Sequence, residues 1–252
     1  MKFTVASLLL SLLCVEYVYC TKFLDQLSKQ GSQLISQSRI PHKTTRQCSC
    51  KENDECVFQM KEQTVDCINT CWTKAGTITE KPQMLKECFI RKRYIVDQFI
   101  DCIQNKMNTC VNTDEGPQIP YTDIHQLIRL GEQKIESQVE SFKKTLGGGG
   151  SGNGNGDVLI DTALDIADCV KECFVSKNAN GFCFDRMNCQ PLIKEDNNAR
   201  RSLKYCMRTV GWKKEASELC ECAVNAGVNE MNQYCAMLRT INGGGRSTHS
   251  DN

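Results

Sequence analysis

The sequence lacks an excess of charge of either sign. Its 252 residues carry 31 lysines and arginines against 30 aspartates and glutamates. Proteins that bind nucleic acids need a basic surplus facing the phosphates, so this balance argues against a nucleic-acid partner. Histidines are few, and His42, His125 and His249 all lie away from cysteine or acidic clusters with metal-ligand spacing. We therefore expect no metal site and no cofactor.

Sequence motifs of common enzyme classes are also missing. The chain has no G-x-S-x-G, H-E-x-x-H or P-loop pattern. Asp161, Asp165 and Asp168 share one predicted helix, and carboxylates spaced in this way are typical of its solvated face. The even number of cysteines leaves no spare thiol to act as a nucleophile. We therefore expect a protein that is not an enzyme.

Long apolar runs are absent after the first twenty residues, so we expect no membrane span. Within those twenty residues, Lys2 precedes an apolar stretch from Phe3 to Leu13. This pattern is typical of a secretory signal peptide and is too short to cross a bilayer. We expect residues 1–20 to be removed by cleavage after Cys20, which predicts a secreted, extracellular protein.

What the sequence has in quantity is cysteine, with 18 residues in all. Cys14 and Cys20 fall within the predicted signal, and the other sixteen divide evenly around a glycine run. In an exported chain these cysteines are expected to form disulfides. The first set is Cys48, Cys50, Cys56, Cys67, Cys71, Cys88, Cys102 and Cys110, and the second is Cys169, Cys173, Cys183, Cys189, Cys206, Cys220, Cys222 and Cys235.

The even split predicts two self-contained units, residues 48–111 and 157–240, that each close four disulfides. Eight cysteines allow 105 pairings, and the sequence does not choose among them. The stretches "VDCINTCWTKAG" (65–76) and "ADCVKECFVSKN" (167–178) share a C-x3-C motif, with an aspartate before it and an aromatic after it. This match indicates a duplicated unit that has diverged.

Residue spacing predicts helices throughout the chain. Cys56, Cys67 and Cys71 are eleven and four residues apart, which places them on one stripe of a helix. Residues 120–146 have an apolar period of about 3.6, with Thr122 or Asp123 as the cap, and so form a long amphipathic helix. Strand alternation is nearly absent, so we expect an all-α fold. A short helix is expected in the segment 21–47, and a disordered tail over 241–252.

A glycine-rich linker is predicted between the two units. Seven of its ten residues, 147–156, are glycine, and it contains the one Ser-Gly pair of the chain, at Ser151. Ser151 begins an S-G-x-G sequence, the arrangement at which xylosyl transfer starts a chondroitin or heparan chain. A transferase needs a bare hydroxyl on extended backbone, which flanking glycines supply. The alternative is a plain flexible linker.

The cysteine motifs and the Ser-Gly pair together resemble the nematode chondroitin proteoglycan core proteins, in particular their cysteine-rich domain. The residues that carry the resemblance are "CSCKENDEC", "DCINTCW", "DCVKECF" and the S-G-x-G at Ser151, and they span Cys48 to Cys235. The resemblance implies an extracellular-matrix protein with a chondroitin-type chain on Ser151. Members of that family often carry several Ser-Gly sites, whereas this chain has one.

The sequence is therefore compatible with two functions of different classes. The first is a secreted matrix protein carrying a glycosaminoglycan on Ser151, with other matrix components as partners. The alternative is a secreted, disulfide-rich helical binding module for a lipid or protein ligand, in which the helix at 120–146 covers an apolar pocket. The short basic clusters at 91–93 and 200–201 indicate solvated helix surface or, alternatively, contact with a polyanionic glycan.

Overall fold

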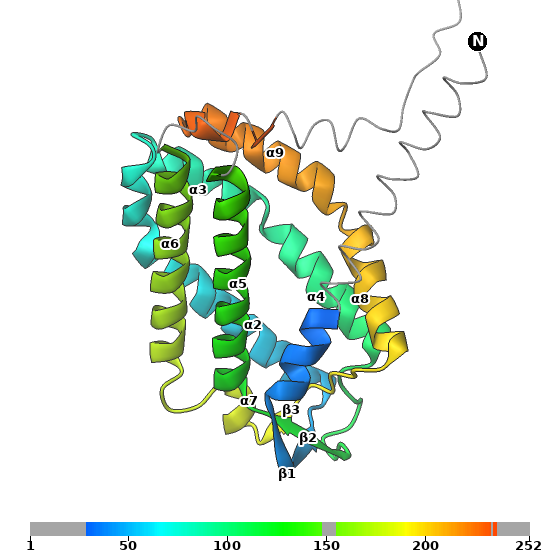
Figure 1. Cartoon of the computed structure of the whole chain (residues 1–252). Coiled ribbons are helices and arrows are strands. Elements are labelled where there is room, and N and C mark those ends of the chain that lie inside the picture. The colour runs from blue at the N-terminus through cyan, green and yellow to red at the C-terminus, as the bar shows by residue number, and fades with distance from the viewer. Residues whose placement is uncertain (1–28, 148–154, 233, 236–252) are drawn as a thin grey trace, which may run out of the picture.

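The computed structural model describes residues 29–147, 155–232 and 234–235, and these form a predominantly helical, disulfide-rich fold, as predicted (Figure 1). The predicted signal peptide and tail lie outside the described residues, and none of the described helices is both long and apolar enough to cross a bilayer. After a helical segment at 29–37 come α2 (Cys50–Cys71), α3 (Pro82–Arg91), α4 (Arg93–Met107), α5 (Ile124–Gly147), α6 (Asn155–Lys177), α7 (Cys183–Arg186), α8 (Asn197–Thr209) and α9 (Trp212–Asn225). The 3-10 turns η1 (Trp72–Thr77) and η2 (Asn229–Met231) follow α2 and α9.

A small sheet is the element that the sequence analysis missed. It consists of β1 (Arg39–Gln47) between β2 (Gln118–Thr122), which is antiparallel to it, and β3 (Cys189–Gln190), which is parallel. Most side chains of β1 are exposed, so the strand lacks the apolar alternation by which a sequence reveals strands. The sheet joins one segment from the second half of the chain to two from the first.

Helix α2 shows why the cysteine stripe was predictable. Ser49 caps the helix, and its side chain and backbone engage Glu52 in a reciprocal capping box. Cys56, Cys67 and Cys71 are all buried on the helix face that was expected. Each of these cysteines forms a disulfide with a residue that follows the glycine run.

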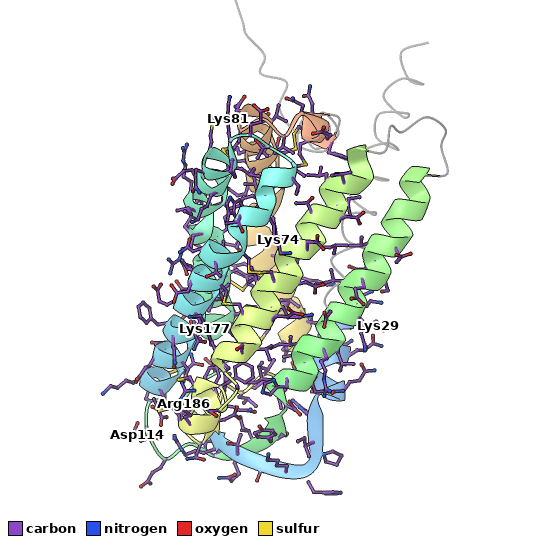
Figure 2. All side chains as sticks on the ribbon, turned by 90° about the vertical axis from the view of Figure 1, so that its left-hand side faces the viewer. Lys29, Lys74, Lys81, Asp114, Lys177 and Arg186 are labelled. Carbon is purple, nitrogen blue, oxygen red and sulfur yellow. A yellow bond between two sulfur atoms is a disulfide. The ribbon has the colours of Figure 1, made fainter. Side chains whose placement is uncertain are left out.

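The two C-x3-C motifs lie opposite each other on antiparallel helices. Cys67 of α2 bonds Cys173 of α6, and Cys71 bonds Cys169, with Cα–Cα distances of 5.6 and 5.8 Å. Figure 2 shows α2 (blue to cyan) beside α6 (yellow-green). The two C-x3-C motifs are therefore bonded to each other, the first cysteine of one motif to the second cysteine of the other.

The expectation that each half closes four disulfides of its own is wrong. Six disulfides join the two halves, and one lies within each half. The crossing bridges are Cys48–Cys189, Cys56–Cys183, Cys67–Cys173, Cys71–Cys169, Cys88–Cys222 and Cys102–Cys206, and the others are Cys50–Cys110 and Cys220–Cys235. The physical reason is that most of these cysteines lie on helices whose packing partner comes from the other half, as α2 packs on α6 and α4 on α8.

The hydrophobic core is likewise shared by the two halves. One cluster surrounds Trp72 and Leu85 and includes Ala226 and Val228 from the region after α9. The Trp72 ring nitrogen donates to the carbonyl of Pro82 at 2.7 Å, which satisfies its polar group within the cluster. Large apolar side chains are few in these clusters and cysteines are many, so sulfur bridges replace part of the burial that larger cores provide.

The capping box of α2 generates a prediction about acid stability. Arg46 forms two hydrogen bonds with the Glu52 carboxylate, at 2.6 and 2.9 Å, and Ser49 adds backbone and side-chain bonds. The Arg46 hydrogen bonds, followed by those from Ser49, lower the pKa of Glu52 from 4.5 to about 2 against the opposing effect of burial. A lowered pKa stabilises the fold above pH 4.5, and this contribution is lost as the pH falls toward 2.

We expect Glu52→Gln to lower the free energy of unfolding by about 2 kcal/mol at pH 7, through the lost ion pair and weakened cap. The deficit should shrink between pH 4.5 and 2, as wild-type Glu52 becomes protonated. Denaturant titrations at stepped pH under non-reducing conditions measure both effects. Glu55→Gln, an exposed position on the same helix, serves as the control and should differ little from wild type. A pH-independent deficit for Glu52→Gln would contradict the assignment.

Candidate functional site

The predicted attachment residue, Ser151, lies outside the described residues. The helices on either side of it are described: α5 ends at Gly147 and α6 begins at Asn155. These two ends lie together at the end of the molecule opposite the small sheet (Figure 1). In the sequence, Ser151 is four residues from each of these helix ends.

A groove runs between α5 and α6, on the amphipathic helix that the sequence predicted. The helix begins at Ile124, since residues 120–122 belong to β2, and Asp123 caps it as expected: its carboxylate accepts a hydrogen bond from the Gln126 backbone N–H at 3.0 Å. The groove has a volume of about 570 Å³, within the usual range for small-molecule sites. Its lining comprises His125, Ile128, Arg129 and Glu132 of α5 with Lys171, Glu172, Val175 and Ser176 of α6.

Lys171 is the electrostatic link across this groove. Its ammonium group forms an ion pair with Glu132 of α5 and another, at 3.0 Å, with Asp168 of its own helix. Hydrogen bonds to Glu132, and then to Asp168, raise the pKa of Lys171, so the side chain stays charged. Arg129 donates to the neutral side-chain oxygen of Gln126 at 2.5 Å. The groove therefore combines aliphatic walls with charged groups at its rim.

An aromatic contact lies next to the groove, at its lining residue His125. The His125 ring lies 4.7 Å from the ring of Phe182, which is fully buried. Asp185 accepts from the Phe182 backbone N–H and from the Tyr121 hydroxyl, each at 3.0 Å. Burial, together with the Asp185 hydrogen bond, raises the pKa of Tyr121 to about 12. His125 was expected only to have no metal-ligand role, and nothing in the sequence around Phe182 pointed to this contact.

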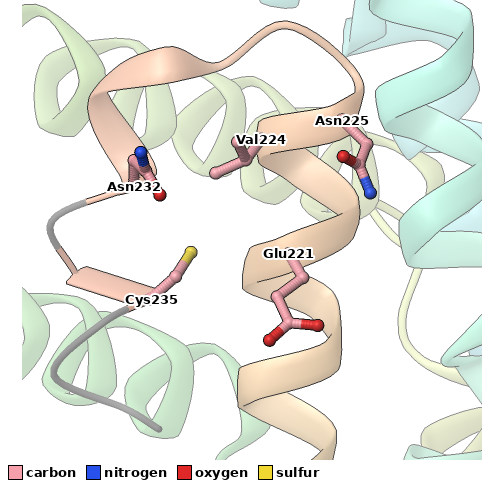
Figure 3. Close-up of a pocket in the computed structure, with 5 residues that line it drawn as sticks. All are labelled: Glu221, Val224, Asn225, Asn232 and Cys235. Carbon is pink, nitrogen blue, oxygen red and sulfur yellow. The ribbon is translucent and has the colours of Figure 1, made fainter.

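A second, smaller pocket of about 260 Å³ lies beside the end of α9. It is lined by Glu221, Val224, Asn225, Asn232 and Cys235. Figure 3 shows Val224 directed toward Asn232 across the pocket, whereas Asn225 points to another side of α9. The sulfur of Cys235 is bonded to Cys220 and offers no thiol. The polar groups do not converge on one point, so the pocket forms no recognisable reaction site.

Within the described residues, one group of three side chains could hold a metal ion by distance, but all three are already bonded to other groups of the protein. Cys48, Glu52 and Cys189 lie close enough together to share an ion. However, the two sulfurs are joined at 2.03 Å, and Glu52 is bound by Arg46. All sixteen cysteines from Cys48 to Cys235 are in disulfides, so none offers a thiolate to a metal or a substrate.

No family model, curated protein or solved structure matches this chain. The resemblance to the nematode chondroitin proteoglycan core proteins therefore depends on the quoted motifs alone and stays a prediction. The function has to be argued from the residues of the chain itself.

Proposed function

We propose that this protein is a secreted structural component of an extracellular matrix, and that it is the core protein for a chondroitin-type chain attached to Ser151. The observation that carries the proposal is the placement of the one Ser-Gly pair between the ends of α5 and α6, on a body held together by eight disulfides.

The disulfides support an extracellular setting. Such bridges persist in oxidising compartments, whereas the cytosol keeps thiols reduced. A bridge such as Cys71–Cys169, which closes a loop of 98 residues, contributes about 4–5 kcal/mol by loop closure when considered alone. Several bridges that span the same loops add less than their sum, but together they resist local opening and proteolysis. These properties suit a protein that has to persist in a matrix.

The arrangement of α5 and α6 supports attachment at Ser151. Both helices are tied to the body, α6 by its two disulfides to α2 and α5 by the ion pair of Glu132 with Lys171. A glycan between their ends starts at one extremity of the molecule, away from the sheet and its disulfide Cys48–Cys189. The chain then carries fixed negative charge outward, and its counterions and water swell the matrix.

Chondroitinase digestion of the secreted protein tests this proposal. We expect wild type to migrate as a broad, heavy species that collapses to a sharp band after digestion. Ser151→Ala should give the sharp band without digestion, because no acceptor hydroxyl remains. Ser247→Ala is the matched control, since Ser247 follows the other glycine run but has no glycine after it. An unchanged mass of wild type after digestion would reject the proposal.

The groove between α5 and α6 favours a second candidate function, the binding of a small apolar ligand. Ile128 and Val175 provide apolar walls from opposite helices, and the volume of about 570 Å³ accommodates a ligand of moderate size. This function is compatible with the first, because none of the residues that line the groove belongs to the glycine-rich segment that contains Ser151.

Native mass spectrometry of the secreted protein tests the second candidate. If the groove is a binding site, we expect a co-purifying ligand in wild type and its loss in Val175→Arg, which places a charged side chain inside the groove. Val96→Arg, at a position on α4 that is 54% exposed, should retain the ligand. Wild type that is free of ligand, or equal retention by both variants, would count against a binding function.

A further inference from the structure

Helix α8 concentrates positive charge in a chain that is otherwise balanced. Its 13 residues include Arg200, Arg201, Lys204 and Arg208, and they include no carboxylate. The whole chain, by contrast, has a net charge of +1. A local excess of this kind creates a field that attracts polyanions.

Three of these cations lie along the outer face of the helix. Ala199 and Cys206 are buried on the inner face, and Arg201, Lys204 and Arg208 project from the opposite side. Arg201 and Arg208 are seven positions apart, which corresponds to about 10 Å along the helix axis. Arg201 and Arg208 are exposed, and neither forms an ion pair within the part of the chain that the structure describes. Within the described residues, the charges of Arg201 and Arg208 therefore face solvent without a carboxylate partner.

An aromatic ring lies within this row of charges. Tyr205 is 52% exposed and occupies the same outer face. Lys106, from the last turn of α4, places its ammonium group 4.6 Å from the centre of the Tyr205 ring. The surface thus combines cations from two helices with one exposed aromatic ring, which can pack against the apolar face of a sugar ring.

The helix that carries this surface is held rigidly. Asp196 caps α8 by accepting from the Ala199 backbone N–H at 2.7 Å. In the middle of the helix, Cys206 is bonded to Cys102 of α4. A ligand that binds here does not have to order the backbone, which reduces the entropic cost of association.

The other basic run of the sequence provides a contrast. Lys92 is bound to Glu215 and Glu218 of α9, at 2.6 and 2.5 Å, and Arg93 is bound to Glu62 of α2 at 2.7 Å. These cations link helices of the same molecule, so their charge is compensated. Among the residues that the structure describes, Lys92 and Arg93 are thus engaged by carboxylates, whereas Arg201 and Arg208 on α8 form no ion pair.

We propose that Arg201, Lys204, Tyr205 and Arg208 of α8, with Lys106 of α4, form a docking surface for a sulfated glycosaminoglycan chain supplied by another molecule. Sulfate and carboxylate groups along such a chain meet the row of cations, and a sugar ring packs on Tyr205. The inference rests on the proposed function for its extracellular setting, and it does not require a chain on Ser151. The protein then contacts the matrix both through its own glycan and through a neighbour's.

The test uses the full chain with Ser151→Ala, so that no attached glycan competes and the outcome is independent of attachment at that residue. The probe is a chondroitin sulfate oligosaccharide of defined length, titrated by calorimetry at two salt concentrations. We expect binding that weakens as salt rises, because ion contacts release counterions. The variant Lys106→Gln, Arg201→Gln, Arg208→Gln should bind at least about tenfold more weakly, with a flatter salt dependence.

The control removes the same charge elsewhere, at the exposed positions Lys51, Lys74 and Lys81, each changed to Gln. It should retain affinity within about twofold if the α8 surface, rather than net charge, governs binding. Circular dichroism and the count of intact disulfides verify that both variants fold. Undiminished binding by the α8 variant, or equal loss in the control, overturns the proposal. It is also overturned if phosphatidylserine vesicles bind through α8 and the oligosaccharide does not.

Discussion

The fold depends on the covalent joining of two helices that come from opposite sides of the glycine run. Cysteines four residues apart on α2 bond cysteines four residues apart on α6, in reverse order along the chain. Two bridges at this spacing fix both the axial register and the rotation of the helices, because either a shift or a turn would separate one pair. Four further bridges then bind the remaining parts of the two halves to each other.

This joining explains where the surfaces of interest lie. With α6 fixed against α2, α5 runs beside α6, and the end of α5 lies next to the start of α6 (Figure 1). The same arrangement places the α5–α6 groove beside the aromatic contact of His125 with Phe182. The Cys102–Cys206 disulfide similarly fixes α8 against α4. Because Cys206 is on the inner face of α8, the cationic face of α8 points to solvent. A small apolar core is sufficient because sulfur bonds constrain the arrangement.

The sequence predicted the helices correctly but did not predict which helices pack together or which cysteines form disulfides. The 3.6-residue period and the C-x3-C spacing correctly predicted the helices that became α2, α5 and α6, because these patterns report which face of a helix is buried. They carry no information on which helix covers that face, so the assignment of disulfides within each half was wrong. β1 was missed because its polar residues acquire strand structure only from β2 and β3. The sequence suggested a pocket under the helix at 120–146, but it did not identify α6 as the opposite wall or the contact of His125 with Phe182, which are 57 positions apart.

Disulfide mapping of the oxidised protein tests the central claim most directly. Trypsin cleaves after Lys61, Lys74, Lys171 and Lys177, which leaves Cys67 and Cys71 in one peptide and separates Cys169 from Cys173. Without reduction, mass spectrometry should detect the peptide 62–74 joined to both the peptide that ends at Lys171 and the peptide 172–177. A Cys67–Cys71 bridge, or linkage of peptide 62–74 exclusively to cysteines between Cys48 and Cys110, would contradict the account.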